Sequence, residues 1–155
     1  PVIRLNQPEG PVTVEVDREQ FEAAMRKIIL NAIEALDGEG GEIDIHVFSD
    51  HSSHAPDNEV TAGLLEMMRE SSKLFSSRMP CGVAVITDTG YGMDDETRRN
   101  LFVPFYTTKE NGIGLGLATA KKIVEAHHGE LWIASIEGAG TSVGMVLPKT
   151  STLNG

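Results

Sequence analysis

A continuous apolar run, Val83–Ile86, constrains the fold of this chain more than any other segment. A short apolar run bounded by turn residues predicts a buried strand, and this one ends at an acidic residue, Asp88. Residues 12–16 and 43–47 alternate with a period of two, which predicts two further strands. We therefore expect a β-sheet that includes at least one fully covered strand.

Helical periodicity separates these strands. Asp17, followed by Gln20 three residues later, is a capping-box pattern that opens a helix. From Phe21 to Ala35 the apolar residues recur at spacings of four and three, which indicates one helical face. Similar patterns predict further helices at 60–75, 94–101 and 115–127.

The closing segment predicts an antiparallel hairpin, with strands at 131–136 and 141–147 joined by Gly138-Ala139-Gly140. Because strands and helices alternate but the last two strands form a hairpin, we expect an α+β fold. Its mixed sheet carries helices packed on one face. The 155 residues suit one domain, which we place at 1–150, with a tail at 151–155.

Composition limits the function classes. A net charge of −10 argues against nucleic-acid binding, which needs clustered Lys and Arg. No apolar run reaches the roughly 18–20 residues that a membrane helix needs. The start of the chain has no signal or transit signature and is abrupt, so we expect a fragment of a longer protein. Cys81 is the single cysteine, and we interpret it as a small buried residue.

Asn31 lies inside the first predicted helix, although asparagine is a mediocre residue for a helix interior. Its amide oxygen is a ligand type that Mg²⁺ accepts, together with waters and phosphate oxygens. For this residue alone, a solvent-facing asparagine is the simpler interpretation.

The segment Asp88-Thr89-Gly90-Tyr91-Gly92-Met93 follows the buried strand. A carboxylate at a strand end is a hydrogen-bond acceptor suited to an exocyclic amine such as adenine N6. Gly90 and Gly92 allow the backbone to approach a ligand closely, and Met93 can line an apolar base pocket. An EF-hand loop is excluded, because position 93 would have to be Gly and Arg99 would have to be Glu. A plain turn with a capping Asp stays open.

Two later segments indicate phosphate contacts. Gly112, Gly114 and Gly116 precede or open a helix, where consecutive backbone N–H groups form an anion site. The pattern is neither a Rossmann fingerprint, since Leu117 stands where Gly is needed, nor a Walker A motif. Lys109, in a Thr-Thr-Lys segment, can reach a phosphate as a point charge, although a solvated loop lysine is an equal alternative.

Together these motifs resemble the catalytic, ATP-binding domain of sensor histidine kinases, within the superfamily that includes gyrase, Hsp90 and MutL (GHKL, the Bergerat fold). Asn31 resembles the N-box asparagine, and residues 88–93 resemble the G1 box, whose Asp reads adenine. Phe102-Val103-Pro104-Phe105 resembles the F box and residues 112–117 resemble the G2 box. In Gly138-Ala139-Gly140-Thr141 the threonine matches one that supports the adenine-reading Asp. The resemblance extends from Val12 to Pro148, and the short Thr-Thr-Lys lid is similar to that of the nitrogen-regulation type.

The resemblance implies a two-layer α/β sandwich with a mixed, mainly antiparallel sheet of about five strands. It implies that ATP and Mg²⁺ are bound under a lid, with Asn31 on the metal and Lys109 at the γ-phosphate; no general base is assigned. The implied nucleotide contacts are Asn31, Ala35, Asp88, Gly90, Gly92, Met93, Thr107, Thr108, Lys109, Gly112, Ile113, Gly114, Leu115, Gly116, Leu117 and Thr141.

The implied activity is transfer of the γ-phosphate to a histidine on a separate dimerisation domain of the same parent protein, in two-component signalling with a response regulator. The chain has five histidines, and none lies in a phosphoacceptor-like helix. The domain is expected in the cytoplasm, without membrane contact of its own, whether or not the parent is membrane-anchored. The alternatives are a degenerate, non-catalytic module and an ATPase or serine kinase of the same superfamily.

Two features depart from the family pattern. Lys27 stands where the family often has a second asparagine, and where ATPase relatives carry a glutamate that activates water. Residues 49–80 are longer than the usual link between the two strands that they join. We interpret this insertion as a local elaboration with a buried helical stripe, with a docking surface as the alternative. A metal site at His51 and His54 is disfavoured, because the nearby acids are scattered.

Overall fold

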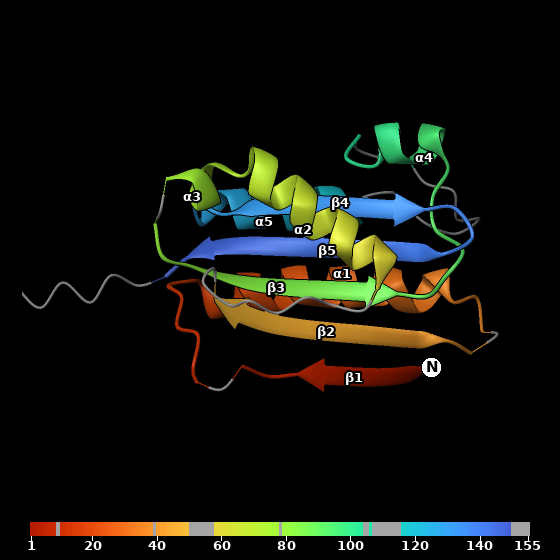
Figure 1. Cartoon of the computed structure of the whole chain (residues 1–155), viewed down its shortest axis with the longest axis horizontal. Coiled ribbons are helices and arrows are strands. Elements are labelled where there is room, and N and C mark those ends of the chain that lie inside the picture. The colour runs from red at the N-terminus through yellow and green to blue at the C-terminus, as the bar shows by residue number, and fades with distance from the viewer. Residues whose placement is uncertain are drawn as a thin grey trace, which may run out of the picture.

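Five strands form one mixed sheet in the order β1-β2-β3-β5-β4, as the computed structural model in Figure 1 shows. The model describes residues 1–8, 10–38, 40–49, 58–77, 79–103, 106 and 116–149. The strands are β1 (Val2–Asn6), β2 (Glu42–Ser49), β3 (Cys81–Asp88), β4 (Glu130–Ile136) and β5 (Gly140–Pro148). The helices are α1 (Arg18–Ala35), α2 (Glu59–Ser71), α3 (Lys73–Ser76), α4 (Asp95–Asn100) and α5 (Gly116–Ala126).

The central strand β3 pairs antiparallel with both β2 and β5, and β4 pairs antiparallel with β5. Only β1 among the described strands runs parallel to its neighbour, β2. Within β3 every residue except Ala84 is buried. The predicted α+β fold with a mixed, mainly antiparallel five-stranded sheet is confirmed, and so is the buried strand that ends at Asp88.

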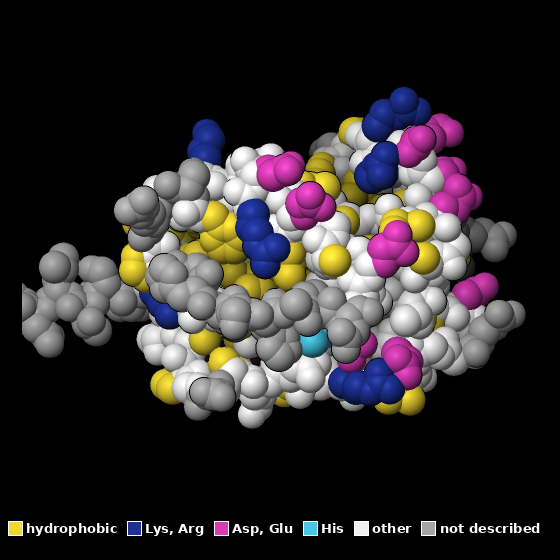
Figure 2. Space-filling view, in the orientation of Figure 1, with side chains coloured by type: hydrophobic (Ala, Val, Ile, Leu, Met, Phe, Trp, Pro, Cys, Tyr) yellow, Lys and Arg dark blue, Asp and Glu magenta, His cyan; other side chains and the backbone are white. Residues whose placement is uncertain are grey.

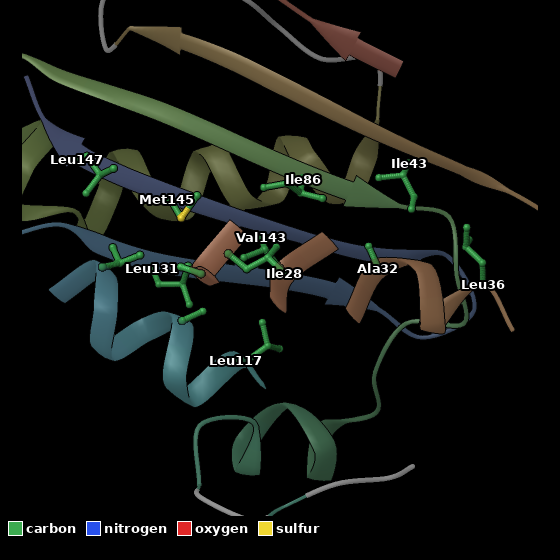
Figure 3. Close-up of a cluster of buried hydrophobic side chains, with 13 residues drawn as sticks. Ile28, Ala32, Leu36, Ile43, Ile86, Leu117, Leu131, Val143, Met145 and Leu147 are labelled. Atoms are coloured by element: carbon green, nitrogen blue, oxygen red, sulfur yellow. The ribbon is translucent and has the colours of Figure 1, made fainter. Parts of the chain in front are cut away.

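Helices α1 and α5 pack together on one face of the sheet. The side chain of Asp17 accepts a hydrogen bond from the backbone N–H of Gln20 (2.9 Å), which confirms the predicted cap of α1. Ile28 of α1 and Leu117 of α5 are buried in one cluster with inward-facing residues of the strands (Figure 3). The strand residues of this cluster are Ile43, Ile86, Leu131, Val143, Met145 and Leu147.

The prediction that all helices pack on one face is wrong. Leu64 and Met68 of α2 are fully buried against Val83, Val85 and other residues on the opposite face, so α2 lies across the sheet from α1 (Figure 1). The physical reason is that β3 is apolar on both faces, and a strand of that kind must be covered on both. The insertion therefore adds a third layer, and the predicted burial of its helical stripe is confirmed. Residues 50–57 of the insertion lie outside the described part of the chain.

The prediction of a strand at residues 12–16 is also wrong, because the structure assigns only an isolated bridge between Val14 and Lys149 there. One edge strand of the sheet is β1, whose pairing with β2 is reinforced by a bidentate Arg4–Glu42 ion pair. Val14 and Val16 alternate because both pack against the core cluster. Apolar residues that alternate with a period of two therefore indicate burial of alternate side chains, and this burial does not require a paired strand.

The described charged side chains on the face pictured in Figure 2 carry both signs. On the face that α2 covers, the Lys and Arg side chains of the described residues are dispersed among acidic ones (Figure 2), unlike the basic patch that nucleic acid needs. Among the described helices, none combines the length and apolar character required to cross a membrane.

Candidate functional site

Asp88 closes β3 with a buried carboxylate, and the residue is only 3% exposed. Its Oδ1 accepts a hydrogen bond from the backbone N–H of Gly90 (2.9 Å), and the backbone N–H of Thr141 donates to the same carboxylate. Burial raises the pKa of Asp88 above its usual value, while the two backbone hydrogen bonds oppose that rise. A carboxylate in such a place disfavours folding unless it is fully paired, so a ligand that donates a hydrogen bond to it would be bound well.

The loop after Asp88 packs directly on the end of α1. The backbone N–H of Tyr91 donates to the carbonyl oxygen of Ala35 (3.3 Å). A Cβ atom at Gly90 would lie 2.4 Å from that oxygen, so no side chain fits between the loop and the helix. Asn31 lies one helical turn before Ala35 and is half-buried, and Lys27 lies one turn earlier and is also half-buried. The structure thus brings the predicted metal ligand and the predicted base reader to the same end of the sheet.

The β4–β5 hairpin holds the other side of this loop through Ser135, which is buried. Its Oγ accepts from the backbone N–H of Met93 (2.9 Å) and donates to the carbonyl oxygen of Gly140 (3.0 Å). The Oγ1 of Thr141 lies 2.9 Å from the same Oγ and is the donor of that pair, since the single proton of Ser135 is already used. Thr141 therefore contacts Asp88 through its backbone and Ser135 through its hydroxyl group.

Ser135 is not among the residues predicted from the sequence, although its place in the strand carries a signal. Leu131 and Ile133 face the α1 side of the sheet, and Ser135 continues the same alternation. A serine in an otherwise apolar stripe needs a hydrogen-bonding partner in the interior, which indicates a buried polar contact.

The remaining predicted residues divide into three groups. Gly92 lies against the hairpin, where a Cβ atom would approach the carbonyl oxygen of Ile136 to 2.1 Å. Gly116 is exposed at the first position of α5, whereas the side chain of Leu117 is buried in the core, so only its backbone is available to a ligand. The rest of the lid and of the glycine-rich segment lies outside the described residues: Thr107, Thr108, Lys109, Gly112, Ile113, Gly114 and Leu115.

A cleft lies at the end of the sheet opposite to Asp88. It has a volume of about 580 Å³, and its lining includes Asp17, His127 and Lys149. The Nε2 of His127 accepts from the backbone N–H of Asp17 (3.0 Å), and its Nδ1 lies 2.7 Å from the carbonyl oxygen of Ile123. His127 thereby joins the C-terminal end of α5 to the start of α1, and none of the predicted nucleotide residues lines this cleft.

The described residues hold no cluster of three or more His, Cys, Asp or Glu side chains that could bind a metal ion. An Mg²⁺ ion that arrives with a nucleotide takes most of its oxygen ligands from water and phosphates, so it does not need such a cluster. His51 and His54 lie outside the described residues.

Comparison with known proteins identifies the family of the chain. Residues 16–151 match the family described as histidine kinase-, DNA gyrase B- and HSP90-like ATPases. The chain is 29% identical over 135 residues to the signal transduction histidine-protein kinase AtoS of Escherichia coli (strain K12), covering 87% of this chain and 18% of AtoS. It is 30% identical over 149 residues to the sensor histidine kinase WalK of Bacillus subtilis (strain 168), covering 92% of this chain and 20% of WalK.

Solved structures show the same fold. The catalytic domain of the histidine kinase ThkA matches with a TM-score of 0.66 and 25% identity, over 96% of this chain and 78% of that domain. Full-length ShkA in complex with AMPPNP matches with a TM-score of 0.65 and 20% identity, over 95% of this chain and 25% of ShkA, which supports the fold alone. This chain spans about a fifth of the length of AtoS and of WalK. By the match over residues 16–151, it belongs to the family of histidine kinase-, DNA gyrase B- and HSP90-like ATPases.

Proposed function

We propose that this chain binds ATP with Mg²⁺ and donates the γ-phosphate to a histidine on a separate dimerisation domain of its parent protein. The observation that carries this proposal is the buried carboxylate of Asp88, which is held by two backbone N–H groups beside the end of α1. A buried acceptor of this kind suits the exocyclic amine of adenine. The family match and the named sensor histidine kinases among the relatives support the same activity.

Each part of the nucleotide has an assigned set of residues. Asp88 accepts a hydrogen bond from the adenine amino group, and Gly90, Gly92 and Met93 shape the base pocket. Asn31 contributes an oxygen ligand to Mg²⁺, which supplies neutralisation of phosphate charge. We assign the phosphates to the backbone of residues 112–117 and the γ-phosphate to Lys109. In this proposal these residues bind and orient the nucleotide, and none acts as a general base.

Lys27 favours transfer to a protein side chain over hydrolysis. It lies one turn before Asn31, at the position where ATPase relatives carry a water-activating glutamate, and a lysine lacks the carboxylate that takes the proton from water. The acceptor is then a histidine of the dimerisation domain, and a response regulator receives the phosphoryl group next. A cytoplasmic location fits such a partner.

Isothermal titration calorimetry of Mg²⁺·ATP with Asp88→Asn tests the nucleotide site. The variant has nearly the same shape but presents an amide, so we expect heat of binding to be lost while the protein stays folded by circular dichroism. Asp95→Asn, on the exposed first turn of α4, is the matched control and keeps wild-type affinity. Unchanged affinity in Asp88→Asn would refute Asp88 as the base reader.

A second experiment tests phosphotransfer. The purified chain is mixed with a dimerisation domain of its parent and labelled ATP, and the phosphate bond formed is tested for stability in acid. Acid-labile label on the partner supports a phosphohistidine, whereas acid-stable label indicates a serine kinase. No label, together with intact ATP binding, would favour the non-catalytic module, for which Lys27 in place of a second asparagine is the supporting feature.

A further inference from the structure

Three buried hydroxyl groups join α2 to the sheet. Thr61, Thr87 and Ser142 are each no more than 3% exposed. The Oγ1 atoms of Thr61 and Thr87 lie 2.7 Å apart, and the Oγ of Ser142 lies 2.7 Å from Thr87 Oγ1 and 3.5 Å from Thr61 Oγ1. We call these three residues the hydroxyl cluster.

Every hydroxyl group of the hydroxyl cluster has a hydrogen-bonding partner only when all three members are present. Each hydroxyl group has one proton and accepts at its oxygen, so three of them can donate in a ring. Such a ring inside a protein is a rigid contact when it is complete, and it leaves an unpaired buried donor when one member is removed. Thr61 is the only member that α2 contributes, and its backbone N–H is held by the capping side chain of Asn58 (3.2 Å).

The hydroxyl cluster lies one step along the sheet from the candidate nucleotide site. Thr87 pairs with Ser142 across β3 and β5, and the next pair in the ladder is Asp88 with Thr141. Successive side chains of a strand point to opposite faces. Thr87 and Ser142 therefore face α2, while Asp88 and Thr141 face the α1 side and are hydrogen-bonded to each other there.

We propose that Thr61 is a positioning residue for the nucleotide site. Through Thr87 and Ser142 it holds together the two strand ends that present Asp88 and Thr141, so the docked α2 sets how well the site binds adenine. This inference rests on the proposed ATP binding and assigns a role to the insertion. Thr61 acts from the opposite face of the sheet and touches no ligand itself.

A reciprocal effect follows from thermodynamic linkage. If docking of α2 strengthens nucleotide binding, then bound nucleotide must strengthen the docking of α2 by the same factor. A partner that pulls on or presses against α2 would in turn change nucleotide affinity. The insertion is then a point at which the activity of this domain can be adjusted.

Calorimetry on two substitutions of the same residue tests the proposal. Thr61→Val keeps the shape of the side chain and removes the hydroxyl group, whereas Thr61→Ser keeps the hydroxyl group. We expect Thr61→Val to weaken Mg²⁺·ATP binding by about 2- to 30-fold, the range for residues that couple to a site without touching the ligand. Thr61→Ser should restore the affinity to near the wild-type value.

The matched control is Leu74→Ala in α3, at the far end of the same layer, where the backbone N–H of Leu74 donates to Glu130 (3.1 Å). It should lower thermal stability and leave ATP affinity unchanged. Equal loss of affinity in Leu74→Ala and Thr61→Val would overturn the proposal, because general loosening of the layer would then explain both.

Hydrogen exchange of the wild-type protein supplies a readout that does not depend on any variant folding. Bound Mg²⁺·ATP should slow exchange of the amides in residues 59–71, and unchanged exchange there would overturn the proposal. Wild-type affinity in Thr61→Val would overturn it while leaving ATP binding intact. Absence of ATP binding by the wild-type protein would instead refute the proposed function, and this inference with it.

Discussion

The backbone N–H of Tyr91 donates a hydrogen bond to the carbonyl oxygen of Ala35, with 3.3 Å between nitrogen and oxygen. This contact joins the loop after β3 to the last residue of α1. Because Asn31 lies one turn before Ala35 and Asp88 lies three residues before Tyr91, the contact sets the spacing between the proposed metal ligand and the proposed base reader.

Substitution of Gly90 tests this spacing. A Cβ atom there would lie 2.4 Å from the carbonyl oxygen of Ala35. Because this oxygen belongs to a helix backbone, it can move away only at a substantial cost in free energy. We expect Gly90→Ala to lower stability by about 1–3 kcal/mol, as overpacked sites do, and to weaken ATP binding. Urea unfolding and calorimetry measure the two effects.

The matched control is Gly63→Ala in α2, where an added Cβ atom meets nothing within 4 Å. In a helix interior this change should stabilise the protein by roughly 0.5–1 kcal/mol and leave ATP binding unaltered. Wild-type affinity in Gly90→Ala would show that the contact with Ala35 does not control the site.

The buried carboxylate predicts a pH dependence of stability. Because burial raises the pKa of Asp88 in the folded state above 3.8, Asp88 favours folding at pH values below 3.8. That contribution is lost as pH rises through the folded-state pKa. Asparagine does not titrate, so the free energy of unfolding of Asp88→Asn minus that of the wild type should increase with pH above 3.8 and then level off.

Urea unfolding of both proteins at a series of pH values measures this difference. Hydrogen-bonding partners lower the pKa values of Glu42 and Asp94, so these two groups change the free energy of unfolding with pH in the opposite direction. Both groups are present in the two proteins, so their contributions cancel in the difference. Parallel pH profiles would contradict a raised pKa at Asp88.

Ser135 should contribute to stability out of proportion to its size. In Ser135→Ala the backbone N–H of Met93 and the hydroxyl group of Thr141 both lose a buried partner. Leaving a buried donor unsatisfied costs about 1–3 kcal/mol, and we expect a loss of that size in thermal or urea unfolding. Ser71→Ala at the exposed end of α2 is the control and should change stability by less than about 0.5 kcal/mol. Similar losses in the two variants would refute the role of Ser135.

We expect His127 to stabilise the fold and to take no part in nucleotide binding. Its Nε2 accepts the backbone N–H of Asp17, so His127→Ala should lower stability by about 1–2 kcal/mol, the effect of one lost hydrogen bond with some packing. ATP affinity should not change, because this contact lies at the end of α1 opposite to Asn31. His128 has a positive φ of 62°, which asparagine tolerates, so His128→Asn is the neutral control. Loss of ATP binding in His127→Ala would contradict this assignment.

Local sequence patterns determined most of the helices and strands, and the order of the motifs along the chain. Neighbouring residues determine the cap at Asp17, the buried run before Asp88 and the closing hairpin, so the local sequence is enough to predict them. The motif order was also enough to predict the family, to which the match over residues 16–151 assigns the chain.

The tertiary structure decided which faces and edges those segments occupy. An apolar stripe on α2 predicts that the helix is buried, but only packing against Val83 and Val85 shows that it covers the face opposite to α1. Alternation at residues 12–16 predicts one-sided burial. The edge position of β1 could not be predicted from local patterns, because its pairing partner is 40 residues away. Ser135 and Thr61 were not assigned roles for the same physical reason. The sequence places Ser135 in an apolar stripe but does not identify its partner or that of Thr61, because the partners Thr141 and Thr87 lie on other strands.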